Sequence, residues 1–329
     1  MLSPFLVFFV GVALVFDFLN GFHDSSNVVA TTISSRAMAP QRALVLSALA
    51  SLAGPFIMGV AVARTIGHEV VVETAATTPV VLAALLSAIT WNVLTWLLAI
   101  PSSSSHALMG GLVGAVAVGH GLRSIIPGGL FRVLLSLFIS PLVGLAVGYL
   151  MMKVILVLAR AATPRINYFF RRAQTLTALA LALSHGANDA QKTMGIIAMG
   201  LLARGALTHF RVPTWVIGAS AGAMALGTAL GGWRIIHTLG RKFYRIRPIH
   251  GFTSQIAAGG VILTAALLGG PVSTTHVVSS SILGVGSAER LNKVRWNVAG
   301  PIAAAWLFTI PATGSLAALL YPLLQRFVS

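Results

Sequence analysis

The sequence contains no cysteine and few charged residues. Of its 329 residues only 9% are charged, and only six are Asp or Glu. The absence of cysteine excludes disulfide bonds and thiolate metal sites. Soluble domains carry about 25% charged residues, so the low charge excludes an ordinary soluble domain. The chain also lacks the Gly-x-x-x-x-Gly-Lys-Ser/Thr loop that cradles nucleotide phosphates, which argues against direct ATP drive.

Apolar residues dominate instead. The chain is 57% hydrophobic, its mean hydropathy is +0.90, and apolar runs of about 20 residues recur along it. This pattern predicts an all-α polytopic protein of the cell (plasma or inner) membrane, with the lipid bilayer as its surroundings. The net charge of +16 does not indicate a nucleic-acid partner, because the basic residues cluster in short loops between apolar runs, where the positive-inside rule explains them.

Two polar stretches interrupt long apolar runs and resemble one another. Residues 20–27 read Asn-Gly-Phe-His-Asp-Ser-Ser-Asn, and residues 185–192 read His-Gly-Ala-Asn-Asp-Ala-Gln-Lys. A carboxylate in hydrocarbon persists only where it faces a partner, a cavity or an ion. We expect the glycine before each aspartate to break the helix and free carbonyls for a cation, although a buried polar network that holds helices together is the alternative. The predicted cation-coupling residues are Asp24, Asp189, Asn20 and Asn188.

The first stretch extends a longer polar face. Asp17, Asn20, Asp24 and Asn27 are spaced i, i+3, i+7 and i+10, so they share one face of a helix. Oxygen-bearing side chains on one stripe suit a hard cation such as Na⁺, or a proton relay. Asp17 alone fits a structural role, because Ala182 takes its place in the second half.

A second pair of motifs reads Pro-Ser-Ser-Ser-Ser-His at 101–106 and Pro-Val-Ser-Thr-Thr-His at 271–276. Proline disfavours helix in the residue before it, and Ser and Thr are good N-caps, so each motif predicts the start of a short half-helix whose N-terminus attracts an anion. A packing role is the alternative for a single Ser/Thr cluster. His106 and His276 are expected to pack or to donate from a distance rather than to bind a metal. The hydroxyls predicted to surround a tetrahedral oxyanion belong to Ser103, Ser104, Ser105, Ser273, Thr274 and Thr275.

Both motif pairs occur in the same order, which predicts an internal duplication. The first repeat is residues 1–158, a basic cytoplasmic linker is residues 159–174, and the second repeat is residues 175–329. In each half a full-length run precedes the proline motif and a short run follows it, as in a re-entrant hairpin. Each half then crosses the membrane an odd number of times, so the repeats are inverted, with the basic loops inside and both termini extracytoplasmic. Inverted repeats with broken helices are typical of secondary transporters.

Lys192 is the main difference between the two stretches, because it takes the place of Asn27. Asp189 precedes it by three residues, close enough to pair on a helix. A fixed ammonium there complements an anionic substrate, replaces a bound Na⁺, or forms a static ion pair with Asp189. Because the second cation position is then filled by the protein, and a desolvated ammonium could release a proton during transport, we expect proton coupling ahead of Na⁺ coupling.

Together, these four motifs resemble the PiT family of inorganic phosphate transporters, over essentially the whole chain. The resemblance implies an inverted-repeat helical bundle that binds phosphate and a coupling cation at the repeat interface near the bilayer midplane, with no catalytic residue and no cofactor. It adds Asn27 and Lys192 to the residues expected to bind phosphate. His23 before Asp24, and Gln191-Lys192, match the bacterial low-affinity branch, for which proton coupling and metal-phosphate co-transport are described.

The expected function is therefore an H⁺- or Na⁺-coupled secondary symporter that imports inorganic phosphate. A metal-phosphate:proton symporter is the first alternative, and an anion-selective channel is a weaker one because a channel does not need two buried aspartates. An intramembrane hydrolase is disfavoured, because Ser105 and His106 are adjacent on one helix and point to different faces. The coupling ion, a metal site and homo-oligomerisation are left open.

Overall fold

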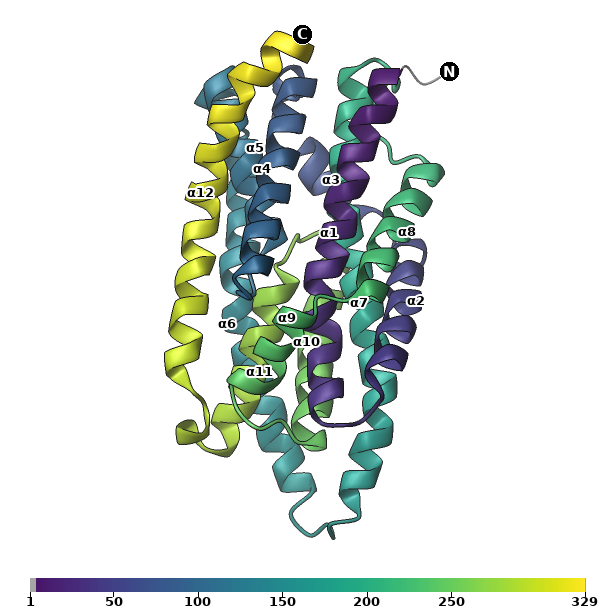
Figure 1. Cartoon of the computed structure of the whole chain (residues 1–329), viewed down its shortest axis with the longest axis vertical. Helices are drawn as coiled ribbons and strands as arrows, with labels where there is room; N and C mark the ends of the chain where they lie inside the picture. The colour runs from purple at the N-terminus through teal and green to yellow at the C-terminus, as the bar shows by residue number, and fades with distance from the viewer. Residues whose placement is uncertain (1–3, 329) are drawn as a thin grey trace.

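The computed structural model describes residues 4–328, and every regular element within them is helical (Figure 1). The elements of the first half are α1 (Pro4–Ser34), α2 (Pro40–Met58), α3 (Ala61–His68), η1 (Glu73–Ala75), α4 (Thr78–Leu97), α5 (Ser104–Gly119), η2 (Leu122–Ser124) and α6 (Pro127–Leu158). Those of the second half are α7 (Ile166–Ala203), α8 (Thr214–Leu230), α9 (Trp233–His237), η3 (Thr238–Lys242), α10 (Pro248–Leu267), α11 (Thr274–Glu289), η4 (Leu291–Lys293) and α12 (Trp296–Val328).

Several helices have the length and composition of membrane spans. Among the described residues five helices qualify, namely α1, α2, α4, α6 and α12, and the bent pair α8–α9 makes a sixth if it counts as one span. Leu142 of α6 and Phe308 of α12 are about two-thirds exposed, at 68% and 67%, as expected of side chains that face lipid tails. The prediction of an all-α polytopic membrane protein is confirmed.

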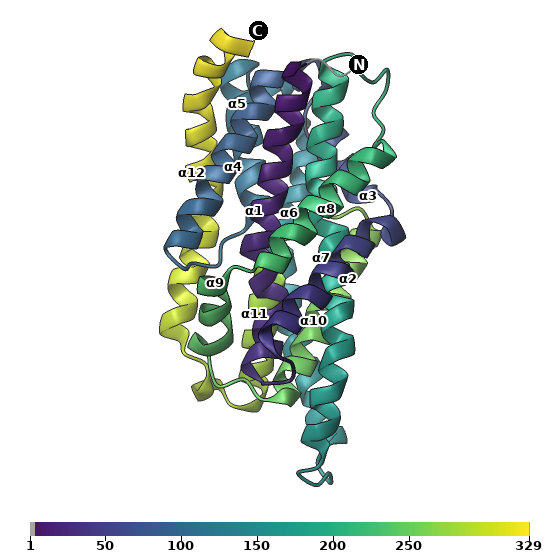
Figure 2. The ribbon, with the colours of Figure 1, turned by 45° about the vertical axis from the view of Figure 1, so that its right-hand side comes forward.

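Two helical hairpins enter the molecule from opposite ends. The hairpin α4–α5 starts at the end that holds both termini, and the hairpin α10–α11 starts at the other end (Figures 1 and 2). Their tips meet in the interior, where the Ser105 hydroxyl donates to the Val272 carbonyl over 3.3 Å and the His106 and His276 ring centroids are 4.4 Å apart. The two hairpins predicted from the proline motifs are therefore present.

The two halves pack on each other in a reciprocal way. Helix α1 packs on α8 while its counterpart α7 packs on α2, and α5 packs on α12 while its counterpart α11 packs on α6. Helix α1 also begins at the end of the molecule where the N-terminus lies, whereas α7 begins at the opposite end (Figure 1). An inverted duplication predicts both features, and the inversion stays a prediction. Helix α7 begins at Ile166, so the linker predicted at residues 159–174 is helical over more than half of its length.

The helix breaks predicted at the two aspartate stretches are wrong, because α1 and α7 are continuous through them. The glycines instead allow other helices to approach closely. A Cβ at Gly21 would collide with the backbone of Met224 on α8, and one at Gly186 would collide with the backbone of Ser51 on α2. The broken span lies elsewhere, between α8 and α9, whose axes differ by 59°.

Arginines from four basic segments gather at one end of the molecule. They line a cavity of about 1090 Å³ at the end opposite the termini. Glu69, which follows α3 and is not part of this cavity, lies 3.6 Å from Arg132 of α6. This grouping of the basic loops agrees with the positive-inside pattern, and the assignment of that end to the cytoplasm stays a prediction. The arginines of the cavity are Arg36, Arg171, Arg245, Arg247 and Arg295.

Candidate functional site

The hairpin tips are built by serine caps. The Ser103 hydroxyl accepts from the His106 backbone N–H over 3.2 Å, and the Ser273 hydroxyl accepts from the His276 N–H over 3.3 Å. The predicted N-caps are confirmed, and both hydroxyls are turned to their own helices rather than to a substrate. The N–H groups of the next two residues in each helix lack a partner in the helix, as at every helix N-terminus, and they give both tips a partial positive charge.

Asp24 of α1 lies against the tip of α11. It is 1% exposed, and its Oδ1 accepts from the Thr275 hydroxyl over 3.0 Å and lies 2.8 Å from His23 Nδ1. The Asn27 amide donates to the same Thr275 hydroxyl over 3.0 Å. The first aspartate stretch, on α1, therefore binds the hairpin tip of the second half.

Asp189 of α7 occupies the matching position on the other side. Its carboxylate pairs with Lys192, lies 3.1 Å from His185 Nε2, and accepts from the Thr274 hydroxyl over 2.7 Å. The Thr274 hydroxyl is also 3.5 Å from Asp24 Oδ2. Thr274 thus stands between the two carboxylates and joins the two halves of the site.

Lys192 is held on three sides. Besides Asp189, its Nζ donates to the Ser105 hydroxyl over 2.5 Å and to the Val272 carbonyl over 2.7 Å. The contact of Lys192 with Ser105 is the counterpart of the contact of Asn27 with Thr275, because both residue pairs correspond between the repeats. A fixed ammonium therefore sits where both hairpin tips and the second carboxylate meet, which is a suitable place for an anion.

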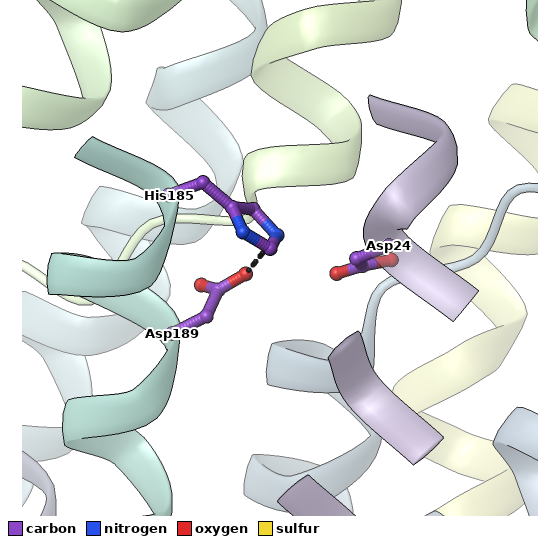
Figure 3. A group of neighbouring side chains, drawn as sticks. All are labelled: Asp24, His185 and Asp189. Atoms are coloured by element: carbon purple, nitrogen blue, oxygen red, sulfur yellow. Dashed lines mark ion pairs between the residues drawn. The ribbon is translucent and has the colours of Figure 1, made fainter. Parts of the chain in front are cut away.

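Three of these side chains also form a candidate cation site. Asp24, His185 and Asp189 are buried, and their ligand atoms all lie within 4.8 Å of one another. Figure 3 shows Asp24 on α1 facing His185 and Asp189 on α7. Two carboxylates suit a hard cation, and the added imidazole suits a divalent transition metal or Zn²⁺.

Other residues expected in the site lie outside this cluster. Ser104 is buried and forms no side-chain hydrogen bond within residues 4–328. Asn188 donates to the Gly270 carbonyl over 3.1 Å, whereas both amide atoms of Asn20 lack a partner in the described part of the chain. His106 and His276 pack, with the His276 ring stacked at 4.0 Å on Trp306.

Two histidines of the site were not predicted from the sequence. His185 precedes Asp189 by four residues, a spacing that places both on one helix face and was a usable signal. His23 is adjacent to Asp24, a spacing that gives no such signal. Both imidazoles flank a carboxylate, so they orient it and hydrogen-bond or coordinate whatever it binds.

Comparison with known proteins shows which family the chain resembles over nearly its whole length. A sequence profile of the phosphate transporter family matches residues 20–317. A Rhizobium meliloti (strain 1021) protein named "Probable low-affinity inorganic phosphate transporter" is 43% identical over 320 residues, which are 97% of this chain and 96% of the relative. A Bacillus subtilis (strain 168) protein of the same name is 40% identical over 319 residues, 95% of each chain. A solved structure, "The sodium-dependent phosphate transporter", shares the fold with a TM-score of 0.92 and 22% identity, over 98% of this chain and 99% of its own.

Proposed function

Because the chain belongs to the phosphate transporter family, we propose that it imports inorganic phosphate by cation-coupled symport, with both ligands bound where the hairpin tips meet. The relatives are transporters, so the chain is a transporter and not an enzyme. The hydroxyls of Ser105, Thr274 and Thr275 at the tips contact Lys192, Asp189 and Asp24, respectively.

The charge of the site supports coupling to a cation. Where the hairpin tips meet, two carboxylates, Asp24 and Asp189, are buried with one ammonium, Lys192, so one carboxylate there has no ammonium partner. An anion that enters at about 4 Å from an unbalanced carboxylate is opposed by about 4 kcal/mol at an effective dielectric constant of 20. A cation that binds at Asp24 removes this repulsion, so phosphate and cation favour each other's binding. The placement of two buried carboxylates and one ammonium at the hairpin tips is the observation that carries the proposal.

The anion-binding side is supplied by Lys192 and the two tips. Lys192 contributes a full positive charge, and the N-termini of α5 and α11 contribute free N–H groups. The hydroxyls of Ser105, Thr274 and Thr275 now bind Lys192 and the carboxylates, and phosphate would compete for them. The arginine-lined cavity at the basic end raises the local concentration of anions on that side of the membrane.

A neutral metal-phosphate complex is a second candidate substrate. It is favoured by one observation, the His185 imidazole beside Asp24 and Asp189, because divalent metals bind imidazole well and Na⁺ does not need it. A metal ion delivered with phosphate would then take the place of the coupling cation at the two carboxylates.

The experiment that tests this function is uptake of labelled phosphate by purified protein in proteoliposomes. Separate arms impose a pH gradient, a Na⁺ gradient, or neither, each with and without Mg²⁺ or Zn²⁺ outside. Symport predicts accumulation above equilibrium under at least one cation gradient, whereas equilibration without accumulation under every gradient would indicate a channel. Uptake that requires the divalent metal would identify the metal-phosphate complex.

Thr275 is expected to set phosphate affinity. Thr275→Ala removes a hydroxyl that contacts both Asp24 and Asn27. A hydrogen bond to a charged group is worth about 1.5–3 kcal/mol, so the Michaelis constant for phosphate should rise about ten- to a hundredfold. The matched control is Thr275→Ser, which keeps the hydroxyl and should stay near wild type. Equal Michaelis constants for phosphate in Thr275→Ala and wild type would show that Thr275 has a packing role only.

A further inference from the structure

Besides Asp24 and Asp189 the chain has one other aspartate, Asp17, which lies outside the site described above. It lies on α1 about two turns before Asp24 and is 0% exposed. Neither of its carboxyl oxygens has a hydrogen-bond partner of normal geometry among the residues that the structure describes. A buried carboxylate without a partner is strongly unfavourable, so the position calls for a ligand that neutralises it.

Polar groups from three helices face Asp17. The hydroxyls of Thr193 on α7 and Ser220 on α8 lie beside its carboxyl group. Both hydroxyls, and the amide of Asn20 one turn further along α1, are buried and lack partners within the described chain. Ser220 stands in a Gly-Ala-Ser-Ala-Gly stretch, but it lies inside the continuous helix α8 and not on a strand-to-helix turn, so it is no hydrolase nucleophile.

The charged neighbours of Asp17 come from α7. Asp189 and Lys192 both act on it electrostatically, and Lys192 is already held by Asp189, Ser105 and Val272. The other helices packed against this part of α1, α4 and α8, carry no titratable residue. No protein cation is therefore available to neutralise Asp17 within the described chain.

The unbroken helices distinguish between a metal cation and a proton. Hard cations are held by several oxygens, and inside membranes these are commonly carbonyls freed by a helix break. Beside Asp17 lie only the hydroxyls of Thr193 and Ser220, on continuous helices with engaged carbonyls, whereas the site at Asp24 has a second carboxylate and an imidazole. A proton needs only the carboxylate, and the two hydroxyls accept from or donate to the carboxyl group that results.

We propose that Asp17, with Thr193 and Ser220, is a proton-binding site of the transport cycle, separate from the cation position at Asp24. This inference rests on the proposed symport of phosphate. An Oδ of Asp17 binds a proton from the side where phosphate enters, and the O–H bond breaks to release that proton on the other side. The site occurs once, because Ala182 replaces Asp17 in the second half, so it carries one proton per cycle.

The test uses the full-length protein in proteoliposomes that contain a pH-sensitive dye and receive labelled phosphate. A gradient of about one pH unit gives about tenfold phosphate accumulation per coupled proton. Wild type and Asp17→Glu should show this accumulation, together with proton influx. Asp17→Asn should show no pH-driven accumulation, and its proton-to-phosphate ratio should fall by one proton on whatever phosphate flux remains.

An unchanged ratio in Asp17→Asn would overturn the inference while leaving phosphate transport intact. No phosphate flux in the wild type would overturn the proposed function and this inference with it. If Asp17→Asn does not fold, Ser220→Ala and Thr193→Val test the same site, because each removes a hydroxyl that lies beside Asp17. Each should lower pH-driven phosphate accumulation and the proton-to-phosphate ratio, and wild-type values in both would contradict the proposal.

Discussion

Replacing Asp24 with asparagine will abolish gradient-driven phosphate uptake while leaving a folded, membrane-inserted protein. Asparagine keeps the shape and a carbonyl oxygen for Thr275, but it removes the negative charge that attracts the cation. The lost charge interaction is worth about 3 kcal/mol or more, which corresponds to at least about a hundredfold loss of uptake. Folding should survive, because no ammonium or guanidinium depends on Asp24 among the described ion pairs.

The measurement is uptake of labelled phosphate under the gradient that drives the wild type, with the amount of folded protein checked by size-exclusion profile. Glu69→Gln is the matched control, since Glu69 is a carboxylate outside the site, after α3, and lies 3.6 Å from Arg132 of α6. That control should transport normally. Wild-type uptake by Asp24→Asn would mean that this carboxylate has a structural role only.

Replacing Lys192 with asparagine will make the stability of the protein depend on Na⁺. The change leaves Asp189 as a buried carboxylate without its ammonium, and breaking a buried pair costs about 3–5 kcal/mol. It also restores the pattern of the first half, in which Asn27 stands at this position. A cation that binds the vacated site stabilises the folded state, so the Tm of the variant should rise with Na⁺ concentration.

Thermal unfolding of purified wild type and Lys192→Asn in NaCl, compared with choline chloride at equal ionic strength, measures this effect. The wild type should gain less, because its own ammonium fills the position. Phosphate affinity of the variant should fall in parallel, because Lys192 supplies the fixed positive charge of the anion site. Equal Na⁺-dependent shifts in the two proteins would show that Lys192 does not occupy a cation position.

The sequence was sufficient to predict the parts of the site that depend on local spacing. Lys192 pairs with Asp189 three residues away on one helix, and Ser103 and Ser273 cap the helices that follow their prolines. The resemblance to the PiT family, rather than any spacing, led to the expectation that phosphate and cation bind at one interface between the repeats.

Local sequence spacing could not predict contacts between helices that are far apart in the chain. Gly21 was predicted to break the helix, because local spacing does not reveal that it packs against Met224, some 200 residues later in the chain. Ser104 and Thr274 occupy equivalent positions in the two repeats, yet only Thr274 reaches the carboxylates. Such differences arise from how the two halves pack on each other, which neither repeat encodes alone.

The central claim is that phosphate and its coupling cation bind together at the hairpin tips, because two carboxylates are buried there with one ammonium. Equilibrium binding of labelled phosphate to the purified protein, measured across pH and Na⁺ concentration, tests this claim most directly. Phosphate affinity should rise at least about tenfold, equivalent to about 1.4 kcal/mol of coupling, as the coupling cation saturates, and this dependence should be lost in Asp24→Asn. Phosphate that binds the wild type equally well at every pH and Na⁺ concentration would contradict it.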